Sequence, residues 1–170
     1  MVDTVEEMQR IVEDEASRSN VQIRRWSQSS CGTAFWDTNE VKIPKPVDFD
    51  TLGVCFHEFG HVVLGHCGKT LAYKPVYVQE YEAEQYAILK LKEHGCYNRR
   101  YEIGAKAHVL MKIAQAKNRG HNMRDVPKEI VDWVELLQVN KWNAAKKVWV
   151  GGGNGSSCKK MEDINIQLYN

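Results

Sequence analysis

The chain has 170 residues, of which 43% are hydrophobic and 26% charged, and these values are typical of one compact globular domain with its own core. The formal net charge of +1 argues against a strongly basic nucleic-acid-binding protein and against a protein held on an anionic membrane surface. Residues 1–17 are acidic and amphipathic, unlike a secretory signal, and no apolar stretch approaches the roughly 20 residues that cross a bilayer.

The five cysteines are an odd number without a Cys-x-x-Cys pair, which predicts reduced thiols rather than a disulfide framework. We therefore expect a cytoplasmic protein without a membrane or direct nucleic-acid partner. A structural metal cluster of His66, Cys67, His94 and Cys96 is an alternative, but its irregular spacing favours free thiols.

The first predicted elements are a helix and a small sheet. Apolar residues at helical spacing predict a helix over residues 4–18. Three strand-like runs follow at residues 21–26, 33–36 and 41–43. Turn residues separate the last two runs, and prolines end the pattern, so we expect a three-stranded antiparallel sheet.

Helices are predicted for most of the remaining chain. Asp48 or Asp50 can cap a helix that runs to about Cys67, with Gly68 as its stop. Further helices are expected at residues 78–94 and 98–117, and from Pro127 to about Val148. The expected fold is α+β, with an N-terminal helix, a small sheet and a C-terminal helical bundle. One domain would span residues 1–150, followed by a glycine-rich flexible link and short tail over 151–170.

The segment His57-Glu58-Phe59-Gly60-His61 places two histidines four residues apart on a predicted helix. Residues at this spacing share a helix face, so both imidazoles can bind one metal ion. Glu58 is turned by about 100° from His57, where it can hold and deprotonate a metal-bound water. Chance matches to this motif occur on surface helices, but apolar neighbours here predict a buried helix whose polar groups need a partner. Zinc, at one ion per chain, is the metal that imidazole and carboxylate ligands with an open position favour.

A catalytic zinc site needs a third protein ligand, and several residues compete for this role. His66 would face away from His57 on an unbroken helix, which favours a core or helix-end position for it. On the next helix, Glu80 and Glu84 share a face with small and apolar residues, whereas Glu82 points to the other side. Helical phase therefore favours Glu80 as the ligand and Glu84 as an outer partner that accepts the free N–H of a ligand histidine. The alternative is that all three glutamates lie on a solvated helix surface.

The two motifs together resemble the ImmA/IrrE family of metallo-endopeptidases, which are gluzincins. The resemblance rests on HEFGHVVLGH at residues 57–66 and on EYEAEQYA at residues 80–87. The preceding TAFWDTNEVKIP is similar to the strand pair that leads into the zinc helix of that family, and the likeness extends over about residues 1–95.

By this resemblance, His57, His61 and Glu80 match the zinc ligands and Glu58 the general base. Glu84 stands where the family usually carries a shorter polar residue such as Asn. The resemblance implies a zinc-dependent metallo-endopeptidase. Some family members cleave a repressor, and many are encoded in phages and mobile elements, so a regulatory or repressor protein is the expected substrate.

Two further expectations concern the reaction. The oxyanion formed during peptide hydrolysis needs a donor, for which Tyr77, Tyr81 and His108 are candidates, although a packing role is favoured for each. Residues 41–43 are expected to form an exposed edge strand that aligns the substrate as an added β-strand.

Two rival functions share the HExxH motif. One is a zinc-stabilised binding module that docks to a regulator with little or no proteolysis. Glu58 argues against it, because metal binding alone does not require this residue. The other is a SprT-like peptidase acting on DNA-bound proteins, which uses a third histidine, and a ligand at Glu80 argues against that group.

Overall fold

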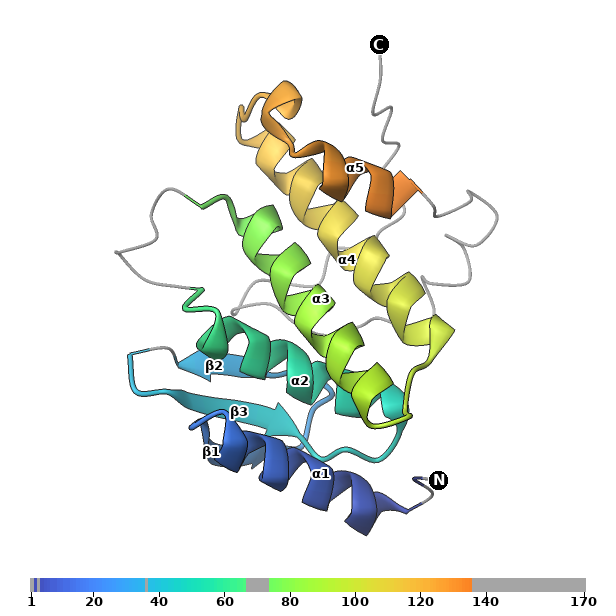
Figure 1. The fold of residues 1–170 in the computed structure, drawn as a ribbon. Coiled ribbons are helices and arrows are strands. Elements are labelled where there is room, and N and C mark those ends of the chain that lie inside the picture. Colours follow the sequence, from blue (N-terminus) through green and yellow to red (C-terminus); the bar gives the residue numbers. More distant parts are fainter. Residues whose placement is uncertain (1, 3, 36, 67–73, 136–170) are drawn as a thin grey trace.

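The computed structural model describes residues 2, 4–35, 37–66 and 74–135, and within them the fold is α+β with five α-helices and a three-stranded mixed sheet (Figure 1). The helices are α1 (Val5–Arg18), α2 (Phe49–Val63), α3 (Val76–Glu93), α4 (Arg99–Asn118) and α5 (Lys128–Glu135). The strands are β1 (Gln22–Ser27), β2 (Thr33–Phe35) and β3 (Glu40–Pro44), and a short 3₁₀ helix, η2 (Met123–Asp125), precedes α5.

The expected antiparallel sheet is wrong in its topology. The strand order is β1-β3-β2, with β3 parallel to β1 and antiparallel to β2. The third strand is therefore central rather than an exposed edge, and both Val41 and Ile43 are fully buried. The physical reason is composition, because β3 buries its apolar side chains best in the middle, whereas the more polar β1 and the short β2 tolerate the edges.

Helix α2 lies against β3 and β2 and forms the centre of the fold. Asp48 caps it, and a reciprocal capping box joins the Asp48 side chain to Thr51. The helix ends at Val63, earlier than expected, because Gly65 adopts the left-handed conformation with a φ of 64°. The expected stop at Gly68 lies outside the described residues.

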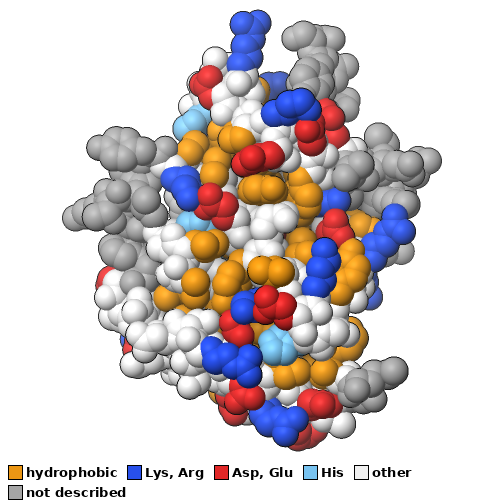
Figure 2. Space-filling model, in the orientation of Figure 1, with side chains coloured by type: hydrophobic (Ala, Val, Ile, Leu, Met, Phe, Trp, Pro, Cys, Tyr) orange, Lys and Arg blue, Asp and Glu red, His pale blue; other side chains and the backbone are white. Residues whose placement is uncertain are grey.

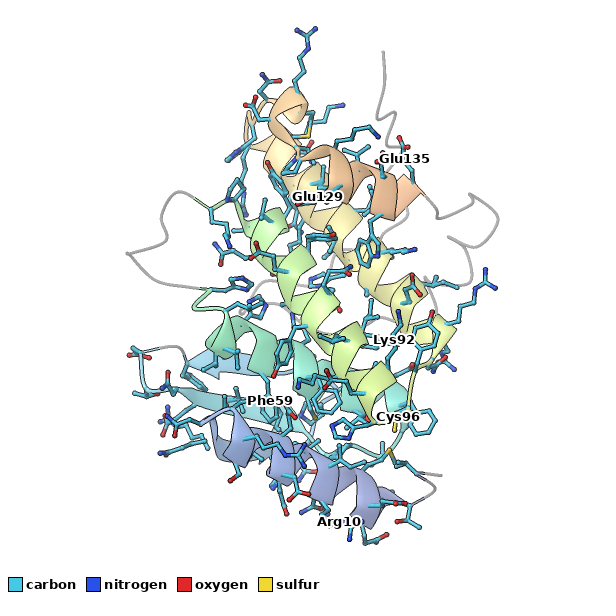
Figure 3. The ribbon with its side chains drawn as sticks, viewed as in Figure 1. Arg10, Phe59, Lys92, Cys96, Glu129 and Glu135 are labelled. Atoms are coloured by element: carbon cyan, nitrogen blue, oxygen red, sulfur yellow. The ribbon has the colours of Figure 1, made fainter. Side chains whose placement is uncertain are left out.

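A large apolar core joins α1, the sheet, α2 and the second half of α3. Phe59 lies where α2 meets the sheet, while Arg10 projects from the outer side of α1 (Figure 3). A second apolar cluster lies among α3, α4 and α5, so these three helices form the expected C-terminal bundle. The predicted extension of α5 beyond residue 135 and the glycine-rich link at 151–157 lie outside the described residues.

Acidic and basic side chains are interspersed over the face that α3 and α4 present, without a basic stripe (Figure 2). Among the described residues, no helix is both long and apolar enough to cross a membrane.

Candidate metal centre

Helices α2 and α3 cross at unusually close range, and this crossing positions the site. A Cβ atom placed on Gly60 would lie 3.1 Å from the Cα atom of Ala83, so a side chain at position 60 would require the facing helix to shift by a few tenths of an ångström. The apolar face of α3 predicted from helical phase is confirmed, since Ala83, Glu80 and Glu84 are all buried on it. The glutamates of α3 therefore face the histidines of α2.

Three potential ligand atoms converge between these helices. His57 Nε2 lies 3.0 Å from His61 Nε2 and 3.3 Å from Glu80 Oε2, and His61 Nε2 lies 3.5 Å from Glu80 Oε2. Three ligands of a tetrahedral ion with bonds of ~2.0–2.1 Å are separated by ~3.3–3.4 Å. The spacing of these atoms therefore fits one zinc-sized ion without a change of helix position.

Glu84 lies behind this group of atoms. Its Oε1 is 3.2 Å from His57 Nδ1, within ion-pair range although not aligned as a hydrogen bond, and 3.1 Å from His108 Nδ1. The hydroxyl of Tyr101 donates to Glu84 Oε2 at 2.8 Å. One fully buried carboxylate thus contacts the Nδ1 atoms of two histidines, which leaves their Nε2 atoms to face Glu80.

Helix α4 supplies two residues on the far side of Glu80. His108 Nε2 lies 3.7 Å from Glu80 Oε2, and Lys112 Nζ lies 2.7 Å from Glu80 Oε1. His57, Glu80 and His108 offer ligand atoms that all lie within 4.8 Å of one another, so His108 is an alternative or additional donor to His61. The His61 group is the tighter of the two, with no separation above 3.5 Å.

The electrostatics of the cluster favour a cation. Burial opposes ionisation of Glu80, but hydrogen bonds with His57 and His61 hold its pKa well below the usual range. Burial likewise disfavours the charged form of His57, yet the charges of Glu84 and Glu80 raise its pKa well above the usual value. The carboxylates therefore draw positive charge to His57, and a divalent ion would take the place of that proton.

Glu58 is buried and closely packed next to the cluster. Burial raises its pKa to about 7, with the charges of Glu80 and Glu84 adding to the effect and His57 and His108 opposing it. A Cβ atom on Gly32, the residue just before β2, would lie 2.6 Å from Glu58 Oε1, so the backbone at Gly32 lies directly against this carboxylate.

Several residues weighed in the sequence are not among the converging ligand atoms. His66 is buried at the end of α2, as expected, where its ring packs edge-on against His61, with centroids 5.4 Å apart, and its Nε2 lies 2.5 Å from Glu82 Oε2. Glu82 also pairs with Lys74, so it faces away from the ligand atoms. Tyr77 and Tyr81 belong to the second apolar cluster, where the Tyr81 ring contacts Trp133.

Of the rival cluster of His66, Cys67, His94 and Cys96, Cys67 lies outside the described residues, and among the described residues the other three do not converge as a metal-ligand group. Cys31, Cys55 and Cys96 are free thiols. His94 stacks on Phe56 instead of approaching a metal-ligand group.

Sequence reasoning weighed His108 only for the oxyanion and missed Tyr101, Lys112 and Gly32. The α4 residues belong to no short motif, and their approach depends on how α4 packs against α3. The one available signal was spacing, because His108 and Lys112 lie four residues apart and so share a helix face. No family model, curated protein or solved structure matches the chain.

Proposed function

We propose that the chain is a zinc-dependent metallo-endopeptidase, with His57, His61 and Glu80 as the ligands and Glu58 as the general base. The observation that carries this proposal is the convergence of the three donor atoms, 3.0–3.5 Å apart, beside a buried carboxylate. A metal-binding protein without catalysis has no need for that carboxylate.

Each residue of the cluster has a distinct role in this proposal. Bound zinc would polarise the peptide carbonyl and activate a water molecule. Glu58, buried beside the cluster, takes a proton from that water and passes it to the leaving amine. Glu84 orients His57 through its Nδ1 atom, 3.2 Å away. His108 places Nδ1 on Glu84 and Nε2 toward Glu80, and as the imidazolium, with a hydrogen on both nitrogens, it would donate from Nε2 to the oxyanion.

An extended peptide is the proposed substrate form. Because β3 is central, it has no open edge for a substrate. The edge strand β2 pairs with β3 on one side only and begins beside Gly32 and Glu58, so we propose that the peptide adds to β2. A peptide added to β2 would pass the general base. By the family resemblance, a regulatory or repressor protein is the substrate class. The odd number of cysteines without a Cys-x-x-Cys pair supports the proposal that the protein acts in the cytoplasm.

Metal content tests the ligand set. Purified wild-type protein is expected to hold one zinc per chain, Glu80→Ala to lose it, and Glu82→Ala to retain it, because Glu82 faces Lys74 and His66. Mass spectrometry of the native protein and atomic absorption would give the stoichiometry. A wild type that binds no zinc even after supplementation would remove the basis of the proposal.

Cleavage tests the general base. Glu58→Gln is expected to keep its zinc and lose about 10²–10⁴-fold in hydrolysis of a fluorescence-quenched peptide library, which is the usual contribution of a positioned acid-base group. Unchanged hydrolysis by this variant would overturn the assigned role.

A zinc-stabilised binding module is the second candidate, and the position of His108 favours it. Four protein ligands are typical of structural zinc sites, and His108 is placed to become the fourth. In that case His108→Ala would weaken zinc binding as much as His61→Ala does, and the wild type would not cleave the library. In the peptidase, His108→Ala keeps the metal and loses cleavage.

A further inference from the structure

Lys112 is the charged residue of the site that the ligand set leaves unexplained. It lies on α4, one turn beyond His108, and its side chain is 19% exposed beside a Glu80 side chain that is 11% exposed. Its Nζ atom lies 2.7 Å from Glu80 Oε1, the distance of a charge-assisted hydrogen bond. An ion pair at this depth needs a function or a structural role, since taking both charges out of water is costly.

The two oxygens of Glu80 have different partners. Oε2 lies 3.3 Å from His57 Nε2, 3.5 Å from His61 Nε2 and 3.7 Å from His108 Nε2, so it faces the centre of the cluster. Oε1 faces the Lys112 ammonium. A carboxylate can bind a metal ion through one oxygen or through both, and binding through both takes a position that a catalytic zinc site leaves open.

We propose that Lys112 is a positioning residue that holds Glu80 to the metal through Oε2 alone. The ammonium occupies Oε1 and keeps it away from the ion, which leaves one coordination position for water or a substrate carbonyl. This inference rests on the proposed metal site and adds a device that keeps the site open.

The structural alternative is that Lys112 merely fastens α4 to α3. The two roles differ in what happens after the positive charge is removed. A fastening role predicts a less stable protein or a weaker metal site with the same coordination. The positioning role predicts an unchanged number of bound ions with one additional oxygen at each ion.

The experiment uses full-length protein reconstituted with Co²⁺, whose visible spectrum reports coordination number, whereas zinc has no such spectrum. The variants are Lys112→Met, which removes the charge, and Lys112→Arg, which keeps it. Lys106→Met is the matched control on the same helix, because Lys106 is also buried but pairs with Glu102 at 2.9 Å. Circular dichroism and thermal unfolding check folding, and Lys112→Gln replaces Lys112→Met if the latter does not fold.

The expected result is one cobalt per chain in every variant, with a severalfold loss of visible absorbance in Lys112→Met alone, as four-coordinate cobalt becomes five-coordinate. Lys112→Arg and Lys106→Met should match the wild type. A wild-type spectrum in Lys112→Met, or loss of its metal, would overturn the positioning role while leaving the metal site established. Failure of the wild type itself to bind cobalt or zinc would instead refute the proposed function.

Discussion

Helix α3 takes part in two buried carboxylate clusters whose partners differ in kind. On the side facing α2 and α4, Glu80 and Glu84 are surrounded mainly by imidazoles. On the side facing α1, Glu15 lies 3.0 Å from Lys90 Nζ and accepts hydrogen bonds from the hydroxyls of Tyr86 and Ser19. His94 also lies 4.0 Å from Glu15, but the hydrogen bonds to this carboxylate come from hydroxyl groups and its short ion pair from a lysine, and these groups keep their protons at neutral pH. Imidazoles can exchange a proton for a metal ion, so the other cluster can change its occupant.

A buried carboxylate of a metal site and a purely structural one differ in the side chains that surround them. Burial does not distinguish them, because Glu15 is 2% exposed and Glu84 is 1% exposed. The carboxylate of a metal site is recognised by neighbouring side chains, such as imidazoles, whose nitrogen lone pairs can all point at one metal ion. Three substitutions test that distinction.

Gly32→Ala is expected to have the largest effect. The added methyl group would collide with Glu58, and displacement of a catalytic group by about 1 Å can cost on the order of 10²-fold in rate. Zinc content should stay at one per chain, since the atoms nearest the added methyl group belong to Glu58 and not to a ligand residue. Peptide-library hydrolysis is the measurement, with the exposed neighbour Thr33→Ala as control. Full hydrolysis by Gly32→Ala would show that the Glu58 position is not critical.

Glu84→Gln is expected to weaken zinc binding by about 10–100-fold, the usual consequence of losing a partner that orients a ligand histidine. Competition with a chromophoric chelator measures the affinity. Glu82→Gln, on the same helix but outside the cluster, should bind zinc like the wild type. Equal affinities for Glu84→Gln and Glu82→Gln would place Glu84 with Glu15 among the structural carboxylates.

Glu15→Gln is expected to leave zinc affinity unchanged and to lower the free energy of unfolding by about 1–3 kcal/mol at pH 7, because its buried partners lose their charged acceptor. Burial opposes ionisation of Glu15, but Lys90, Tyr86 and Ser19 lower its pKa below the usual value. The stabilisation is therefore present above the unfolded pKa of about 4.3 and disappears as the pH falls through the lower folded value.

Denaturant unfolding between pH 7 and pH 3 measures this difference, and the curves for wild type and Glu15→Gln should approach each other at the acid end. The exposed Glu13→Gln on the same helix is the control and should change stability by less than about 0.5 kcal/mol. A gap between the curves that widens toward acid would contradict the assigned sign.

The sequence predicted the local features of the site because they depend on helix periodicity alone. The shared face of His57 and His61 follows from 3.6 residues per turn, and so does the burial of Glu80 and Glu84 while Glu82 stays partly exposed. The α4 residues His108 and Lys112 could not be placed in the same way, because their position depends on packing between helices that are distant in sequence.

In the sheet, too, the contacts between elements distant in sequence could not be predicted. Strand positions followed from local composition, and each was predicted within about two residues. The strand order β1-β3-β2 could not be predicted from local composition. Strands that are neighbours in sequence were expected to pair, whereas β1 pairs with β3. The strand that buries both Val41 and Ile43 lies between two strands that face more solvent.

The absence of a side chain at Gly60 determines which insertions and substitutions the metal site can accept. Ligands from two helices meet because the helices touch backbone to backbone at Gly60 and Ala83. The geometry of the site therefore depends on that contact and not on the length of the segment that joins the two helices. Insertions between the two motifs should leave the ligand spacing intact, whereas a single added carbon at the crossing would shift one set of ligands against the other by a few tenths of an ångström.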